Sequence, residues 1–166
     1  EVSKQVADPW TKQSLQAIIH GSLGRYYLQQ GELQNAIEHS TYSVQDLDSL
    51  VSYYKTNSGS GMSSRQTIQN KEENLITALS ELGSAYQRAG NLQEAIRAYE
   101  RGLAIIRNSK IDAAVEATIS SGLGTVYLAQ KDSVRALEQF RSALQLAEAR
   151  GQNGSIENAS RSIGDL

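Results

Sequence analysis

The sequence contains no cysteine and only one proline, Pro9, in 166 residues. Without cysteine the chain can form neither a disulfide framework nor a thiolate metal site. Proline interrupts helices and marks turns, so its scarcity favours a chain that is mostly helical. Alanine, leucine, glutamine and glutamate are abundant, whereas valine and isoleucine are modest in number, which also favours helix over strand.

An excess of basic charge and a long apolar run are also missing. The 16 Lys and Arg residues nearly balance 18 Asp and Glu, which argues against a dedicated nucleic-acid binder. No segment approaches the roughly 18 apolar residues of a membrane span, and no signal-peptide pattern is present. We therefore expect a soluble protein, cytoplasmic by default. Because the chain begins at Glu1 rather than Met, we expect a processed product or a piece of a longer protein.

No group of residues predicts catalysis, a metal or a cofactor. The glycine-rich stretch at 58–61 has no preceding strand and no following Gly-Lys-Ser/Thr, so its composition indicates a linker. His20 and His39 fall on different helices of one hairpin, and a metal would need further ligands, so we expect a hydrogen-bonded or surface role. Glu72 and Glu73 are adjacent on a helix and diverge by about 100°, which predicts a solvated face. We predict that the chain is not an enzyme.

A segment beginning with Leu-Gly occurs three times. "LGSAYQRAGNLQEAIRAYE" spans residues 82–100, and related segments span 23–41 and 123–141. Each copy places tyrosine four residues after the leucine, at Tyr27, Tyr86 and Tyr127. Each then places alanine nine residues later, at Ala36, Ala95 and Ala136. The residues four further along are Ser40, Tyr99 and Phe140. An internal repeat of this kind predicts one structural unit used several times.

The pattern L-G-x2-Y followed by A-x3-F resembles the tetratricopeptide repeat (TPR) over most of the chain. The resemblance implies an all-α fold, a right-handed superhelical stack of antiparallel helical hairpins that forms a solenoid. The Leu-Gly pairs of the second and third copies are 41 residues apart, which exceeds the usual unit of about 34. Such long repeats resemble those of kinesin light chains and of bacterial arrays joined to caspase-like CHAT domains.

The resemblance implies a single TPR domain over residues 1–166. We place its repeats at 9–54, 67–108 and 111–150, with a partial fourth at 153–166. The first interval is longer than the second, which predicts an elongated junction after the first hairpin with a flexible Gly/Ser loop at 55–66. Asp8 and Pro9 form an N-cap signal, so the first helix is expected from about Pro9 to Gln30.

Small residues are expected where the two helices of a hairpin meet. In the second copy, Gly83 and Ala95 would allow a close approach, beside the larger Tyr86 and Tyr99. The chain departs from the repeat pattern in two copies. Ser40 replaces an aromatic residue, and we therefore expect the first repeat to be less tightly packed. Lys131 replaces the glycine of the third turn.

The resemblance also implies that partners bind a concave groove lined by the first helix of each hairpin. We predict the following partner-binding residues: Arg25, Leu28, Gln29, Ser80, Ser84, Gln87, Arg88, Ser121, Thr125, Leu128 and Arg161. The arginines favour an acidic or carboxylate-bearing segment, and the leucines are candidate apolar anchors. The Lys and Asn clamp of the chaperone-binding members is absent, because Gly21, Arg25 and Glu81 stand at corresponding places.

Three functions follow from this pattern. The first is a protein-interaction module, part of a larger protein, that holds a peptide or helical segment in its groove. The second is a sensor or regulatory arm for an attached effector domain such as a CHAT protease. The third is self-assembly, through the long hairpin or as a weak homo-oligomer through the partial fourth repeat. Neither a nucleic acid nor a membrane is an expected partner.

Overall fold

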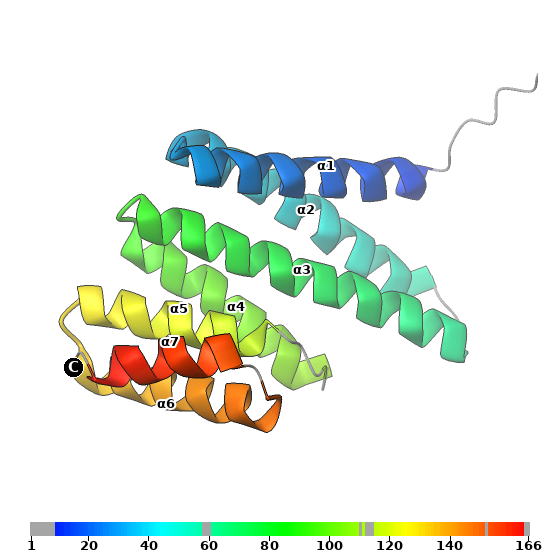
Figure 1. The fold of residues 1–166 in the computed structure, drawn as a ribbon. Coiled ribbons are helices and arrows are strands. Elements are labelled where there is room, and N and C mark those ends of the chain that lie inside the picture. Colours follow the sequence, from blue (N-terminus) through cyan, green and yellow to red (C-terminus); the bar gives the residue numbers. More distant parts are fainter. Residues whose placement is uncertain (1–8, 58–60, 110, 112–114, 152, 165–166) are drawn as a thin grey trace, which may run out of the picture.

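Seven α-helices make up the part of the chain that the computed structural model describes, namely residues 9–57, 61–109, 111, 115–151 and 153–164. They are α1 (Pro9–Gln30), α2 (Leu33–Asn57), α3 (Met62–Arg88), α4 (Leu92–Ser109), α5 (Glu116–Ala129), α6 (Ser133–Ala149) and α7 (Asn153–Gly164). Consecutive helices run antiparallel and stack in chain order, with α1 at one end and α6 and α7 at the other (Figure 1). The predicted all-α stack of hairpins is confirmed, as are the bounds of the first helix.

The odd-numbered helices form the inner row of the stack. Each helix contacts its neighbours in the chain, and α1, α3, α5 and α7 also contact one another in succession. The outer helices α2 and α4 are linked by long side chains, because Arg101 of α4 forms an ion pair with Asp48 of α2. The inner row is therefore the more compact side, and its exposed surface is the one that a ligand crossing several repeats would meet.

The core is continuous along the stack. One cluster of buried apolar side chains joins the first two hairpins, and a second joins the second and third. Tyr86 of α3 and Ile105 of α4 pack against both clusters. No hairpin thus buries its apolar face alone, which is the property that makes such arrays stable only as stacks. None of the helices in the described residues is long and apolar enough to cross a membrane.

A glycine contact joins the two helices of every complete hairpin. The glycine of each Leu-Gly pair faces the residue sixteen positions further along, on the second helix. A Cβ at Gly83 would lie 2.7 Å from Tyr99 Cε1, and a Cβ at Gly124 would lie 2.6 Å from Phe140 Cε1. Carbon atoms do not approach so closely without displacement, so only glycine fits. Gly83 therefore has the role that the sequence predicts.

The first hairpin corrects the expectation of looser packing. A Cβ at Gly24 would lie 2.5 Å from Ser40 Oγ and 3.1 Å from the main-chain nitrogen of Ser40. The missing aromatic ring leaves no gap beside Gly24, because the hydroxyl and the main chain of Ser40 occupy the space there. Ser40 and Ala36 are buried at this contact. The first hairpin is therefore closely packed at this point, with a hydroxymethyl group where the other two have a ring.

The turns between paired helices share one backbone conformation. Gly31 and Gly90 have φ values of 79° and 78°, and Lys131 at the equivalent place has a φ of 63°. Lysine thus adopts a left-handed conformation that is unfavourable for residues with a Cβ. The following Asp132 caps α6 by accepting a hydrogen bond from the Arg135 main-chain N–H at 3.0 Å. Hydrogen bonds from the main chain and from the side chain of Arg135 lower the pKa of the Asp132 carboxyl.

The elongated junction is made of helix rather than loop. α2 continues to Asn57 and α3 begins at Met62, so much of the segment predicted as a loop at 55–66 is helical; residues 58–60 lie outside the described part. Glu72 corrects the expectation of a solvated face, because it is buried and pairs with Lys55 at 2.5 Å between Nζ and Oε1. This pair joins the extended parts of α2 and α3.

Tyr99 links two neighbouring hairpins. Its ring lies between Gly83 of its own hairpin and Gly122 of α5, where a Cβ would lie 2.7 Å from Tyr99 Cζ. The phenol is buried and donates a hydrogen bond to Gln87 Oε1 at 3.2 Å. Burial raises the pKa of Tyr99 to about 12, although a hydrogen bond with Ser84 lowers it in part. The hydroxyl therefore remains protonated at any physiological pH.

We expect Gly122→Ala to destabilise the fold by roughly 1–3 kcal/mol, because the new methyl group overlaps the Tyr99 ring. Urea unfolding followed by circular dichroism measures the change in the free energy of unfolding. Gly164→Ala is the control, since a Cβ there meets no atom within 4 Å. The same Gly122→Ala change in a Tyr99→Ala background should cost much less, and equal costs in both backgrounds would contradict the proposed contact.

Lys131→Gly should stabilise the protein by about 0.5–1 kcal/mol. Relief of the left-handed strain, worth roughly 1–2 kcal/mol, exceeds the cost of a more flexible unfolded chain. Gly90→Ala at the equivalent turn should have the opposite sign. Thermal melts of the two variants test both signs, and a destabilised Lys131→Gly protein would show that the lysine side chain contributes more than its backbone costs.

The free energy of unfolding should fall as the pH rises from about 10 toward 12. The unfolded chain ionises Tyr99 near pH 10, whereas the folded state keeps it protonated up to a pKa of about 12. The stabilising contribution is therefore complete below about pH 10 and is lost above it. Tyr99→Phe should flatten this slope in urea titrations across that range, and an unchanged slope would contradict the assignment to Tyr99.

Candidate functional site

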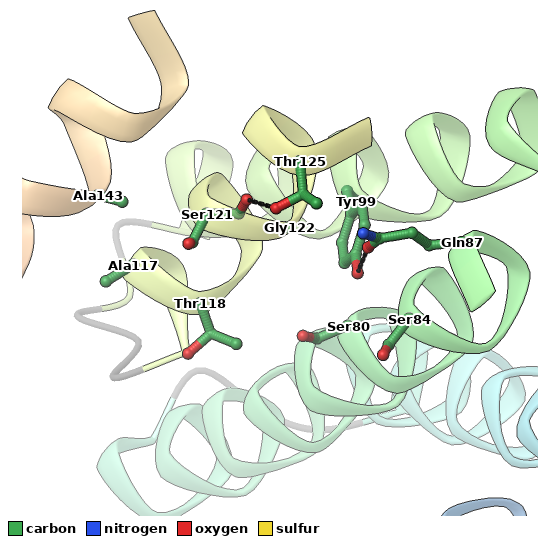
Figure 2. Close-up of a pocket in the computed structure, with 10 residues that line it drawn as sticks. All are labelled: Ser80, Ser84, Gln87, Tyr99, Ala117, Thr118, Ser121, Gly122, Thr125 and Ala143. Carbon is green, nitrogen blue, oxygen red and sulfur yellow. Dashed lines mark hydrogen bonds between the residues drawn. The ribbon is translucent and has the colours of Figure 1, made fainter. Parts of the chain in front are cut away.

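A pocket of about 310 Å³ opens on the inner row between α3 and α5. Figure 2 shows side chains of the two helices on either side of it, with Tyr99 of α4 between them. Its lining residues are Ser80, Ser84, Gln87, Tyr99, Ala117, Thr118, Ser121, Gly122, Thr125 and Ala143. The helical periodicity accounts for this arrangement, because residues three or four apart on α3 and on α5 face the same side.

The pocket is polar but carries no charged side chain. Hydroxyl groups and one amide supply its polar atoms, and small residues leave room for close approach. Thr125 Oγ1 donates to the Ser121 main-chain oxygen at 3.0 Å, so the outward lone pairs of the threonine hydroxyl can accept a bond from a ligand. Such a surface can form hydrogen bonds with uncharged amide groups without burying a charge. This chemistry suits the main chain of a peptide.

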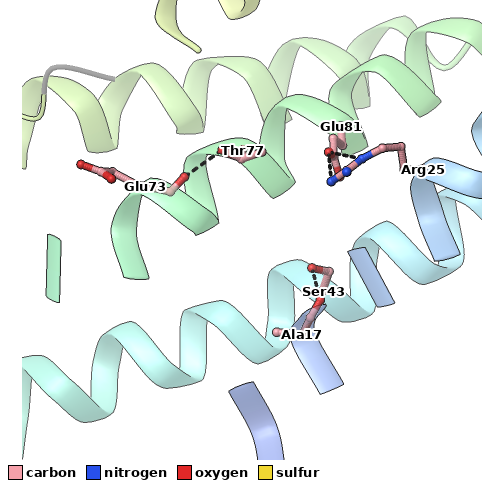
Figure 3. A network of polar contacts seen from close by, with 6 residues as sticks. All are labelled: Ala17, Arg25, Ser43, Glu73, Thr77 and Glu81. Carbon is pink, nitrogen blue, oxygen red and sulfur yellow. Dashed lines mark hydrogen bonds and ion pairs between the residues drawn. The ribbon is translucent and has the colours of Figure 1, made fainter. Parts of the chain in front are cut away.

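A second hollow of about 410 Å³ lies between α1, α2 and α3. At its edge the Arg25 guanidinium donates to Glu81 Oε1, at 2.9 Å from Nε and 2.8 Å from Nη2 (Figure 3). Burial raises the pKa of the Glu81 carboxyl, and the neighbouring Arg25 lowers it in part. Further along, Lys71 Nζ donates to Ser14 Oγ at 3.2 Å. This hollow is therefore charged where the first pocket is neutral.

The structure brings five of the eleven predicted site residues together in the first pocket. They are Ser80, Ser84, Gln87, Ser121 and Thr125. Arg25 lines the second hollow. Leu128 is half-buried against the core, and Gln29 is exposed near the end of α1, away from both hollows.

The three predicted arginines already have partners within the chain. Arg25 is paired with Glu81, and Arg161 pairs with Glu157 on its own helix at 3.1 Å. Arg88 Nη1 donates to the Leu28 main-chain oxygen at 2.5 Å, which connects the ends of α3 and α1. Among the ion pairs of the described residues, none involves Arg88, so its charge is not balanced by a carboxylate.

The sequence analysis missed several residues that line the pocket, Tyr99 above all. It assigned Tyr99 to the core, and the ring is indeed buried, but the hydroxyl end reaches the pocket. Gly122 and Thr118 were also missed. Both positions could have been predicted from the sequence, since Gly122 directly precedes the third Leu-Gly pair and Thr118 lies one helical turn before Ser121, on the same face of the helix. A rule based on fixed repeat positions does not include side chains contributed by the outer helices.

The two histidines form a hydrogen-bonded pair, which is the first of the two roles, hydrogen-bonded or surface, that the sequence left open. Nδ1 of His20 on α1 lies 3.0 Å from Nδ1 of His39 on α2, so one ring donates and the other accepts. Tyr27 stacks on His39 with ring centroids 5.3 Å apart. The residues that the structure describes contain no group of three potential metal ligands. The pair therefore contributes to packing between α1 and α2.

Comparison with protein families matches residues 74–149 to the tetratricopeptide repeat. The matched segment runs from the second half of α3 through α6 and contains every residue that lines the first pocket. None of the curated proteins compared with this chain matches it.

Solved structures extend the likeness to most of the chain. The TPR domain of Arabidopsis FLU is 18% identical, with a TM-score of 0.68, and the alignment covers 82% of this chain and 98% of that domain. BtubC (BKLC) from P. vanneervenii is 16% identical, with a TM-score of 0.51, over 92% of this chain and 63% of that protein. At such identities the likeness concerns the fold alone. With three sequence copies, a matching family model over the central helices and this shared fold, the chain is similar to tetratricopeptide repeat proteins in its repeat pattern and in its fold.

Proposed function

We propose that this chain is a protein-interaction module that binds a peptide segment along its inner row of helices. The observation that carries the proposal is the neutral, hydroxyl-lined pocket between α3 and α5. Tetratricopeptide repeat domains are generally interaction modules rather than enzymes, and the pocket offers hydrogen bonds but no nucleophile paired with a base. Hydroxyls on two successive inner helices would position the main chain of the peptide across the repeats.

The charge preference of the groove centres on Arg88. Arg25 and Arg161 are engaged by Glu81 and Glu157, so a ligand must compete with these carboxylates. Arg88 donates to a main-chain oxygen and lies one residue after Gln87, a pocket residue. An acidic side chain of the peptide near Gln87 would meet this cation. Since exposed ion pairs contribute only about 0–1 kcal/mol, most of the affinity must come from the pocket itself.

Selection from a random peptide display library provides a probe for this groove, and isothermal titration calorimetry then measures its affinity. Ser121→Arg should weaken binding about tenfold or more, because the long side chain fills the pocket. Arg88→Glu should weaken acidic peptides, and more strongly at low salt. Arg141→Glu, an equal charge reversal on the exposed surface of α6, is the control. Equal losses from Arg141→Glu and Arg88→Glu, or full binding by Ser121→Arg, would place the site elsewhere.

A regulatory arm is the second candidate function. The 41-residue spacing of the repeats favours it, because this spacing is similar to that of kinesin light chains and of arrays joined to CHAT proteases. In this role the groove would bind an effector domain of the same protein instead of a separate peptide. The complete coding sequence distinguishes the two candidates, since the second requires a caspase-like or other effector domain on the same polypeptide.

A further inference from the structure

Helix α1 carries four large apolar side chains that are exposed, and one of them, Ile18, also lines the edge of the second hollow. Leu15, Ile18, Ile19 and Tyr26 are 58%, 64%, 48% and 55% exposed. Four of the six large hydrophobic residues that are exposed in the described part of the chain lie on this one helix. The opposite face of α1 contributes Ala17 to the core. A helix that is apolar on both faces is typical of one that is covered on both sides.

The positions equivalent to Ile19 and Tyr26 are buried in the other two repeats. Counting from the Leu-Gly pairs, Ile19 corresponds to Ala78 and Ile119, and Tyr26 corresponds to Ala85 and Val126. All four counterparts are buried. The contact is explicit for Ile119 of α5, whose Cδ1 lies 3.0 Å from the Cβ position of Gly102 on the preceding hairpin. In the second and third repeats these positions thus belong to the interface with the hairpin before. In the first repeat both residues are exposed, and the helix that carries them, α1, lies at one end of the stack (Figure 1).

The exposed residues follow the spacing of a helix–helix seam. Leu15, Ile19, Ser22 and Tyr26 are separated by four, three and four residues, the a/d spacing of a coiled coil. The spacing is the same when it is read in either direction along the helix. A two-fold axis that passes between residues 20 and 21 would therefore place the seam of one copy against the same seam of a second, antiparallel copy. We propose that two copies of this chain dimerise through antiparallel packing of their α1 helices. The seam shares no residue with the pocket between α3 and α5, and of its four positions only Ser22 also lines the second hollow.

Side-chain sizes and charge favour this antiparallel arrangement. Leu15 would pack against Tyr26 of the partner subunit, and Ile19 against the small Ser22 of the partner subunit, much as Ile119 packs against Gly102. Leu15, Ile19, Ser22 and Tyr26, the four central positions of the seam, are all uncharged. Lys12, at the next seam position, would face the neutral Gln29 of the partner subunit, whereas parallel helices would place two lysines together. A closed two-fold contact of this kind is the commonest symmetry among homo-oligomers.

At the opposite end of the stack, the side chains that the structure describes form no comparable surface. Ile163 of α7, in the predicted partial fourth repeat, is half-buried against the core of the preceding hairpin. Val134 is the exposed large apolar residue of α6, and it stands alone. Scattered single residues of this type are normal on protein surfaces, whereas contiguous ones mark interaction sites. Among the described residues, the contiguous exposed apolar surface lies on α1, so the proposed self-association is assigned to this helix.

Sedimentation equilibrium over a range of concentrations tests the dimer. The unmodified chain should show a monomer–dimer equilibrium, and Ile19→Glu should raise the dissociation constant at least tenfold by placing two like charges at the seam. Val134→Glu is the matched control, because it removes an equally large exposed apolar residue elsewhere and should leave the equilibrium unchanged. A chain that stays monomeric at all concentrations, or a dimer equally sensitive to both substitutions, overturns the proposal.

Disulfide trapping tests the register, and the absence of native cysteine makes it unambiguous. Under mild oxidation, a mixture of Ile19→Cys and Ser22→Cys proteins should form mixed dimers in preference to either homodimer. Preferred Ser22→Cys homodimers would indicate a different register or parallel helices, and absence of any cross-link would exclude the seam. Peptide binding in the groove by Ile19→Glu should equal that of the parent chain, so failure of the dimer leaves the groove proposal untouched.

Discussion

The contact between an inner-helix glycine and the residue sixteen positions later organises this molecule. It sets the distance between the two helices of each hairpin, since a Cβ at Gly24, Gly83 or Gly124 would overlap its neighbour. In two hairpins the neighbour is an aromatic ring, and in the first it is Ser40 and its own backbone. The helices adjust their separation to the available volume, because a gap would lose dispersion contacts on both sides.

The same close packing shapes the candidate binding surface. Tyr99 fills the space between two glycines from successive hairpins, and its hydroxyl reaches the pocket between α3 and α5. One side chain thus contributes to the spacing within a hairpin, the spacing between hairpins and the polarity of the pocket. The inner row keeps small hydroxyl residues around it, which leaves hydrogen-bonding groups accessible without a buried charge. Rigid helices hold these groups, so a ligand would find them already arranged.

The described stack has two ends, and at each end the apolar residues that interior repeats bury against a neighbour have no further repeat against them. At one end α7 lies against α6, and Ile163 is partly sheltered by the core. At the other, α1 retains apolar residues at positions that are buried in the interior repeats. In repeat proteins each unit contacts only its neighbours, so the exposed positions of α1 have the chemistry of an interface between repeats. This is why an association surface arises at α1 without any special motif.

The sequence by itself determined the architecture. Three copies of one spacing predict the hairpins, the role of Gly83 and the bounds of α1, because helical periodicity and glycine requirements are local properties of the chain. The predicted helix bounds were wrong where composition alone was used, since residues 55–57 and 62–66, most of them polar, are helical in the extended α2 and α3.

Only the tertiary structure decided which groups meet. Three contacts join residues from different helices. Glu72 is buried beside Lys55, Arg25 pairs with Glu81, and the Tyr99 hydroxyl reaches the pocket between α3 and α5. The close approach at Ser40 was equally invisible, because the loss of an aromatic ring can leave a cavity or draw two helices together. Periodicity states which face a residue occupies, whereas the partner on the facing helix depends on the separation and rotation of both helices. Those quantities are fixed by packing over the whole stack.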